Sequence, residues 1–162
     1  MLIDDSRTFL DSLAFQLNPQ IVYKVFHDSR SAMDWLRAQP YSAMSDPIYA
    51  RSDEQANFFE WHSTHVDLSR IYHISLNRQR FDMPSVLIID YAMPQMNGLE
   101  LCEAVRGLPC KKILLTGQAD EKLAVDAFNR KLIDRFIKKN DPDALNRLEG
   151  EIIQLQKDFF NE

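Results

Sequence analysis

Five polar side chains in this sequence stand at the ends of short apolar runs, where they could form one reactive site. They are Asp4, Asp5, Asp90, Thr116 and Lys139. The runs before them are rich in β-branched and apolar residues, which is typical of buried strands in a parallel sheet. The carboxyl ends of such strands lie along one edge of the sheet, where ligands bind. We therefore expect the five side chains to lie close together.

Three carboxylates, a hydroxyl and an ammonium in one place favour a particular chemistry. Carboxylates at close range repel, so either one of them takes a proton or a cation compensates them. Oxygen ligands without His or Cys favour a hard ion such as Mg²⁺, whose open positions suit phosphate oxygens. This set fits phosphoryl transfer to a carboxylate, which requires in-line positioning and charge neutralisation.

Asp90 is the carboxylate that we expect to react. It follows a predicted strand over Ser85–Ile89, and a turn containing Pro94 and Gly98 comes next. A purely structural role as a helix N-cap is disfavoured, because the following helix begins about eight residues later and its first amides are out of reach.

The rest of the chain alternates strands and helices. Apolar runs predict four further strands, at Met1–Ile3, Ile21–Phe26, Lys112–Thr116 and Ile133–Lys138. Helical spacing of apolar residues predicts helices after Ser6, from Ser29 or Ser31, after Gly98, from Ala119 or Asp120, and after Pro142. This alternation indicates an α/β fold with a parallel sheet covered by helices on both faces.

One segment, residues 41–83, is too long for a helix-to-strand connection and is interpreted as an insertion. In a right-handed α/β unit this connection lies at the end of the sheet opposite Asp90. We therefore expect the insertion to recognise a partner or extend the scaffold without touching the chemistry. Its His62 and His65 are interpreted as surface side chains, because no third metal ligand accompanies them.

Length and composition predict one domain over residues 1–162, located in the cytoplasm. The net charge is −5 and no long Lys/Arg run occurs, which disfavours direct binding of nucleic acid. No apolar run approaches the length of a membrane span. The only two cysteines, Cys102 and Cys110, lack a metal-binding spacing and are interpreted as reduced thiols.

Four segments resemble the receiver domain of two-component response regulators. They are Leu2-Ile-Asp-Asp5, Ile89-Asp-Tyr-Ala-Met-Pro-Gln-Met-Asn-Gly-Leu-Glu-Leu101, Ile113-Leu-Leu-Thr116 and Phe136-Ile-Lys-Lys139. The resemblance covers nearly the whole chain except the insertion. It implies a flavodoxin-like, doubly wound sheet of five parallel strands in the order 2-1-3-4-5, with the inserted segment added.

The resemblance also implies a role for each acid. Asp90 would be the phosphoacceptor, Asp5 would bind Mg²⁺ directly, and Asp4 would bind it mainly through water. The backbone carbonyl of Ala92 would be a further metal ligand. Such a domain is not a metabolic enzyme: it assists its own phosphorylation and a slow dephosphorylation. Its phosphoryl donor would be a sensor histidine kinase or a phosphotransfer protein.

The remaining family positions would carry the signal. Thr116 and Lys139 would bind phosphoryl oxygens, and Phe136 occupies the switch aromatic position, turning inward as Thr116 moves. This motion would alter the face formed by the fourth helix, fifth strand and fifth helix. The last helix, residues 143–162, would lead to an output domain, contact a downstream protein or form a homodimer.

Two departures from the family leave alternatives open. The family usually has proline after its lysine, with a cis peptide bond, whereas Asn140 stands here, so the loop is either trans and reshaped or strained. Counting back from Asp141-Pro142-Asp143 favours Lys138 as the phosphate-facing lysine, but counting from Phe136 favours Lys139, which we prefer because the strand fixes the direction of the side chain.

Two rival functions remain compatible with a strand-end carboxylate. A pseudo-receiver, acting only as an interaction module, is the main alternative to a phosphoacceptor. A phosphatase of the haloacid dehalogenase type is disfavoured, because Ala92 stands where that chemistry requires a second acid.

Overall fold

The computed structural model of the chain describes residues 1–39, 83–117 and 119–161. The chain divides into two compact units, one formed by Met1–Ala38 with Pro84–Glu162 and the other by Gln39–Met83. Nearly all of the predicted insertion, with His62 and His65, lies outside the described residues. The elements of the first unit carry the acids and the lysine singled out above.

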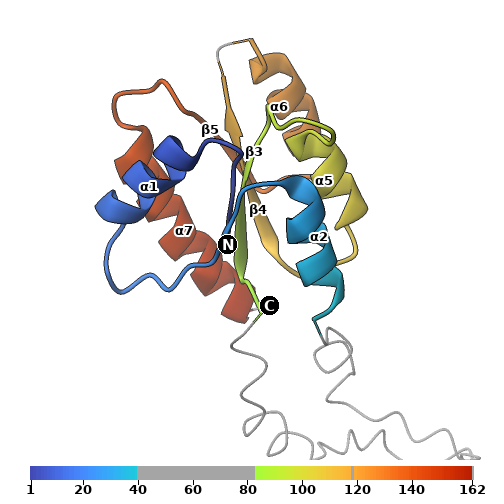
Figure 1. Cartoon of the computed structure of the whole chain (residues 1–162), viewed down its shortest axis with the longest axis horizontal. Coiled ribbons are helices and arrows are strands. Elements are labelled where there is room, and N and C mark those ends of the chain that lie inside the picture. Colours follow the sequence, from blue (N-terminus) through green and yellow to red (C-terminus); the bar gives the residue numbers. More distant parts are fainter. Residues whose placement is uncertain (40–82, 118, 162) are drawn as a thin grey trace, which may run out of the picture. The chain divides into compact units, whose positions relative to one another are not determined.

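A five-stranded parallel sheet lies at the centre of the first unit (Figure 1). Its strands are β1 (Leu2–Ile3), β2 (Val25–Phe26), β3 (Val86–Asp90), β4 (Lys111–Thr116) and β5 (Arg135–Lys138). They are hydrogen-bonded in the order β2-β1-β3-β4-β5, and every neighbouring pair is parallel. The predicted flavodoxin-like fold class and strand order are therefore confirmed.

Helices cover both faces of this sheet. Figure 1 shows α1 (Arg7–Gln16) and α7 (Ala144–Asn161) on one face. The other face carries α2 (Ser29–Arg37), α5 (Gly98–Ala104) and α6 (Glu121–Asn129). This doubly wound arrangement buries both faces of the central strands, which explains why all five residues of β3 are buried.

The core against α1 and α7 follows from apolar spacing in the sequence. In α7, Leu148, Ile152 and Leu155 recur at intervals of one helical turn and are all buried. They pack in one cluster with residues of α1 and the sheet, among them Leu10 and Ile113. This cluster holds both helices against the sheet, and thereby positions the turn between β1 and α1.

Two predicted strands are shorter than the sequence indicated. The prediction of a strand from Ile21 to Phe26 is wrong at its start, because β2 begins only at Val25. The neighbouring β1 has only two residues to pair with it, and the Ile21 N–H donates to Asn18 within a turn. Likewise β5 begins at Arg135 rather than Ile133, which is buried in the preceding turn.

The helix starts agree closely with the sequence, with one change of cap. Ser6 caps α1 as predicted, its Oγ accepting a hydrogen bond from the Phe9 N–H. Helix α2 begins at Ser29, one of the two predicted starts, but its cap is Asp28, whose side chain accepts from the Ser31 N–H. Asp28 therefore satisfies a backbone N–H in the first turn of this helix.

Over the described residues, the longest helices are too short or too polar to cross a bilayer.

Gly98 is the position where the fold tolerates only glycine. A Cβ built there would overlap the backbone carbonyl oxygen of Asp90 and lie 3.0 Å from the Leu114 Cδ1. The close approach lets the Gly98 N–H donate to the Tyr91 carbonyl, which closes the loop after β3. Gly150, in α7, has no atom within 4 Å of the same built Cβ.

We expect Gly98→Ala to lower the free energy of unfolding by about 1–3 kcal/mol, because the backbone near Asp90 must shift to accommodate the methyl group. The matched change Gly150→Ala should raise it by about 0.5–1 kcal/mol, since alanine is the better residue in an open helical position. Urea unfolding followed by circular dichroism measures both. A loss at position 150 equal to that at position 98 would contradict the steric argument.

Candidate functional site

Three acids from two strand ends meet at one edge of the sheet. Carboxylate oxygens of Asp4, Asp5 and Asp90 all lie within 4.8 Å of one another. The register pairs Ile3 with Ile89, so the residues that follow them, Asp4 and Asp90, come side by side. Both are almost fully buried, whereas Asp5 is exposed. The close approach of acids expected from the sequence is therefore present in the structure.

Lys139 is the cation that compensates the two buried acids. Its Nζ lies 2.6 Å from Asp4 Oδ2 and 2.8 Å from Asp90 Oδ1. Its backbone N–H donates to the Thr116 carbonyl at 2.9 Å, which anchors it at the ends of β4 and β5. The neighbouring Lys138 instead pairs with Glu121, 2.7 Å away. Lys139, and not Lys138, is thus the lysine that faces the acids.

The peptide bond after Lys139 is trans, because the described residues contain no cis peptide bond. Of the two alternatives that Asn140 left open, the structure has the trans one. Lys139 reaches the acids with this geometry.

The turn from β1 into α1 carries the acids and an aromatic ring together. Asp4 Oδ1 accepts a hydrogen bond from the Ser6 N–H at 2.9 Å, and Ser6 in turn caps α1 by accepting from Phe9. The Phe9 ring lies beneath the lysine, with its centroid 4.4 Å from Lys139 Nζ. Phe9 was not singled out from the sequence, because it fits the apolar spacing of the helix predicted after Ser6. Its position about one helical turn after Asp4 and Asp5 was the signal in the sequence that could have placed its ring near the site.

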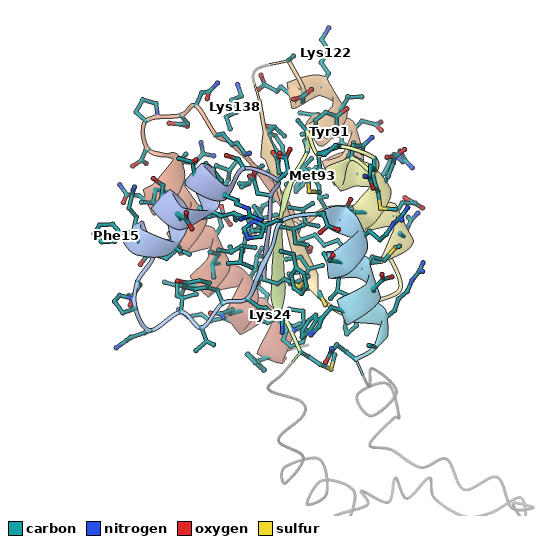
Figure 2. The ribbon with its side chains drawn as sticks, in the orientation of Figure 1. Phe15, Lys24, Tyr91, Met93, Lys122 and Lys138 are labelled. Carbon is teal, nitrogen blue, oxygen red and sulfur yellow. The ribbon has the colours of Figure 1, made fainter. Side chains whose placement is uncertain are left out.

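The loop after β3 forms the other wall of the site. Asn97 caps α5 in a capping box with Glu100, which confirms that Asp90 is not the cap of this helix. The Ser29 hydroxyl of α2 donates to the Met96 carbonyl at 3.1 Å and ties this loop to the adjacent helix. Figure 2 shows Tyr91 and Met93 of this loop at the end of the sheet opposite Lys24.

The other three residues singled out from the sequence lie nearby. Thr116 is fully buried at the end of β4, and its hydroxyl donates to the Ile137 carbonyl at 3.5 Å. Phe136 is half-buried in β5 and meets the Phe128 ring edge-on, with centroids 6.4 Å apart. Ala92 lies in the exposed loop two residues after Asp90. The roles of all three stay predictions.

Burial and pairing shift the ionisation of this cluster. Burial raises the pKa of Asp4, and the hydrogen bonds from Lys139 and Ser6 offset that rise only in part. For Lys139, burial alone would lower the pKa, but the bonds to Asp4 and Asp90 outweigh it and raise the pKa. The charged form of Lys139 is therefore favoured in the folded protein, while burial disfavours the charged form of Asp4.

The donor set fits a hard divalent cation. When all are ionised, three carboxylates and one ammonium give three negative charges minus one positive, a net charge of −2. A divalent ion neutralises this charge, and carboxylate oxygens are the ligands that Mg²⁺ prefers. Asp5, the exposed member, leaves one side of the site open to water and to further oxygen ligands.

Comparison with known proteins shows the family. The model of the response regulator receiver domain matches residues 54–148, more than half of the chain. The matched residues include Asp90, Thr116, Phe136 and Lys139, while Asp4 and Asp5 precede them. The chain therefore belongs to the response regulator receiver family, whose members are signalling phosphoacceptors of two-component systems that generally bind Mg²⁺ at an acidic pocket.

Individual relatives agree with this assignment. The structure of the response regulator LqsR of Legionella pneumophila is 38% identical and superposes with a TM-score of 0.75, covering 99% of this chain and 44% of LqsR. The regulatory protein AtoC of Escherichia coli K12 is 33% identical over 75 residues, which are 45% of this chain and 16% of AtoC. Full-length FixJ from B. japonicum, 21% identical with a TM-score of 0.63, shares the fold over 98% of this chain and 57% of its own. The chain thus spans less than half the length of LqsR and of AtoC.

We expect Lys139→Met to lower the free energy of unfolding by about 1–3 kcal/mol at neutral pH in EDTA, because two buried carboxylates lose their ammonium partner. Added Mg²⁺ should restore more stability in the variant than in the wild type, since no lysine then competes for the carboxylates. The control Lys138→Met removes an exposed pair and should cost at most about 1 kcal/mol. Equal losses in urea unfolding would contradict the burial argument.

We expect Asp4→Asn to raise stability at neutral pH, because burial makes the charged form of Asp4 costly. A carboxyl group whose pKa is raised by folding binds its proton more tightly in the folded state, so the wild type loses stability as pH rises. The advantage of Asn should therefore grow between about pH 4 and about pH 7. Thermal unfolding across this range, with the exposed Asp11→Asn as control, measures it. An advantage independent of pH would contradict the assignment.

Proposed function

We propose that this chain is a phosphoacceptor receiver, in which Asp90 takes a phosphoryl group from a sensor histidine kinase or a phosphotransfer protein. The observation that carries the proposal is the position of Asp90, which lies within 4.8 Å of Asp4 and Asp5 and 2.8 Å from the ammonium of Lys139. A half-buried, preorganised cation at the acceptor carboxylate is what transfer of a negatively charged phosphoryl group requires.

The transfer itself needs little from the protein beyond position and charge. An oxygen of Asp90 attacks the phosphorus of a phosphohistidine, and the P–N bond breaks as its electron pair returns to the imidazole, which takes up a proton. Asp4, Asp5, Asp90 and the Ala92 carbonyl would hold Mg²⁺, which when bound neutralises charge on the phosphoryl oxygens. Lys139 binds one of those oxygens. Attack of water on the acyl phosphate later returns Asp90 and inorganic phosphate.

The output of phosphorylation follows from Thr116 and Phe136. The Thr116 hydroxyl, now donating to Ile137, would turn to a phosphoryl oxygen, and Phe136 would move inward into the space released. The Phe128–Phe136 contact connects this motion to α6. A downstream protein or output domain, or a second copy of the chain, would read the changed face of α6, β5 and α7.

A pseudo-receiver is the second candidate function, and one observation favours it. Lys139 already bridges Asp4 and Asp90, so the two buried acids are compensated without a metal. In that case the domain would present its surface to partners in a single state. The two candidates differ in whether Mg²⁺ and a phosphoryl donor change the molecule.

We expect acetyl phosphate with Mg²⁺ to add one phosphoryl group to the full chain, and beryllofluoride with Mg²⁺ to shift its amide resonances. Asp90→Asn should abolish both effects, because the attacking oxygen is lost. The control Asp158→Asn, at the distant end of α7, should leave both intact. Intact-mass spectrometry and NMR measure the outcome. A wild type that responds to neither reagent would establish the pseudo-receiver instead, and phosphorylation that survives in Asp90→Asn would refute the acceptor assignment.

A further inference from the structure

We propose that Phe9 is a positioning residue, whose ring holds the ammonium of Lys139 in place for phosphoryl transfer to Asp90. The inference rests on the proposed phosphoacceptor function, and it assigns to an α1 side chain a part in that reaction.

The contact has the geometry of a cation–π interaction. Lys139 Nζ lies 4.4 Å from the centroid of the Phe9 ring, well inside the range of about 6 Å over which an aromatic face attracts an ammonium. The lysine side chain is only 21% exposed, so little water screens the attraction. Within the part of the chain that the structure describes, the ammonium thus contacts Asp4, Asp90 and the ring.

The ring owes its place to the same turn that orients Asp4. The Ser6 N–H donates to Asp4 Oδ1, and Ser6 Oγ accepts from the Phe9 N–H at the start of α1. The acid and the aromatic ring are therefore fixed by one short stretch of backbone. A shift of this turn would move both neighbours of the lysine together.

The ring matters most when a divalent cation occupies the acids. Such an ion would engage the carboxylates of Asp4 and Asp90, directly or through water, and would repel the ammonium, so these two attractions on Lys139 would weaken. The attraction to Phe9 does not involve the carboxylates and persists. It keeps the ammonium within reach of an oxygen on the incoming phosphoryl group, where the lysine is needed.

Without the Phe9 ring, the Lys139 side chain could adopt other conformations in a neighbouring cavity. A cavity of about 180 Å³ lies between α1 and α7, and both Phe9 and Lys139 border it, together with Leu13, Pro142 and Leu145. A long lysine side chain has many rotamers, and without the ring some of them point into this space. The same cavity gives room for a larger aromatic ring at position 9.

The test is a series of variants at position 9, phosphorylated by acetyl phosphate at saturating Mg²⁺. Phe9→Leu should reduce the maximal phosphorylation rate constant about three- to tenfold, with little change in the half-saturating acetyl phosphate concentration. Phe9→Trp should preserve the rate constant. Replacement of Phe9 by trifluorophenylalanine, which keeps the shape but weakens the negative face of the ring, should lower it as Leu does. Leu145→Ala, a change in the same cavity away from the ammonium, should leave the rate constant unchanged.

A double-variant cycle separates positioning from packing. In a Lys139→Met background, Phe9→Leu should cause no further loss, because its effect runs through the lysine. An equal loss in both backgrounds, or full activity with trifluorophenylalanine, would overturn the inference while leaving Asp90 as the acceptor. Failure of the wild type to become phosphorylated, or equal labelling of Asp90→Asn, would instead overturn the proposed function and this inference with it.

Discussion

The bridge from Lys139 to Asp4 and Asp90 is the interaction on which the site depends. Two carboxylates buried next to each other are unfavourable, and a third lies within 4.8 Å of them. The lysine makes this arrangement compatible with a folded core, since it reaches both buried acids from its position directly after β5. The same ammonium is the group that binds a phosphoryl oxygen in the proposed reaction. The stability of the fold and the proposed reaction therefore both require the ammonium of Lys139 at this position.

The strand order of the sheet brings the acids together, because β1 lies next to β3, which comes much later in the chain. Strand β1 is only two residues long, yet it lies between β2 and β3 and continues directly into Asp4 and Asp5. Pairing of Ile3 with Ile89 fixes the relative height of Asp4 and Asp90 through backbone hydrogen bonds. Acids attached to hydrogen-bonded strands are held more rigidly than acids on long loops, which is what a preorganised site requires.

Much of this arrangement could be predicted from the sequence, because strand ends in a parallel sheet share one edge. Apolar runs ending in Asp90 and Thr116 revealed the strands, and the family resemblance supplied their order. The strand boundaries of β2 could not be predicted in the same way, because they depend on how few residues β1 offers for pairing. Propensity in Ile21-Val-Tyr-Lys-Val-Phe26 is strong, but no partner lies beside its first residues.

Other features depend on contacts between segments distant in the sequence, which local sequence patterns do not predict. Two counts along the sequence placed the phosphate-facing lysine at different positions, and the contacts of the folded chain distinguish them, because the Lys139 ammonium reaches Asp4 and Asp90. Phe9 has the spacing of a core residue in an amphipathic helix, and this spacing does not reveal that the ammonium of Lys139, which follows β5, lies against its ring. The pair between Lys138 and Glu121 likewise joins segments that no sequence motif connects.

The three acids are unequally buried, so the site is open to solvent on one side, at Asp5. Asp5 is exposed, while Asp4 and Asp90 are shielded and already engaged by Lys139. An ion arriving from solvent would therefore meet Asp5 first, and would bind the carboxylates of Asp4 and Asp90 only as Lys139 releases them. Ion binding and release of the Lys139 ammonium would then be coupled, so the rate of ion binding would depend on how readily Lys139 leaves the two buried acids.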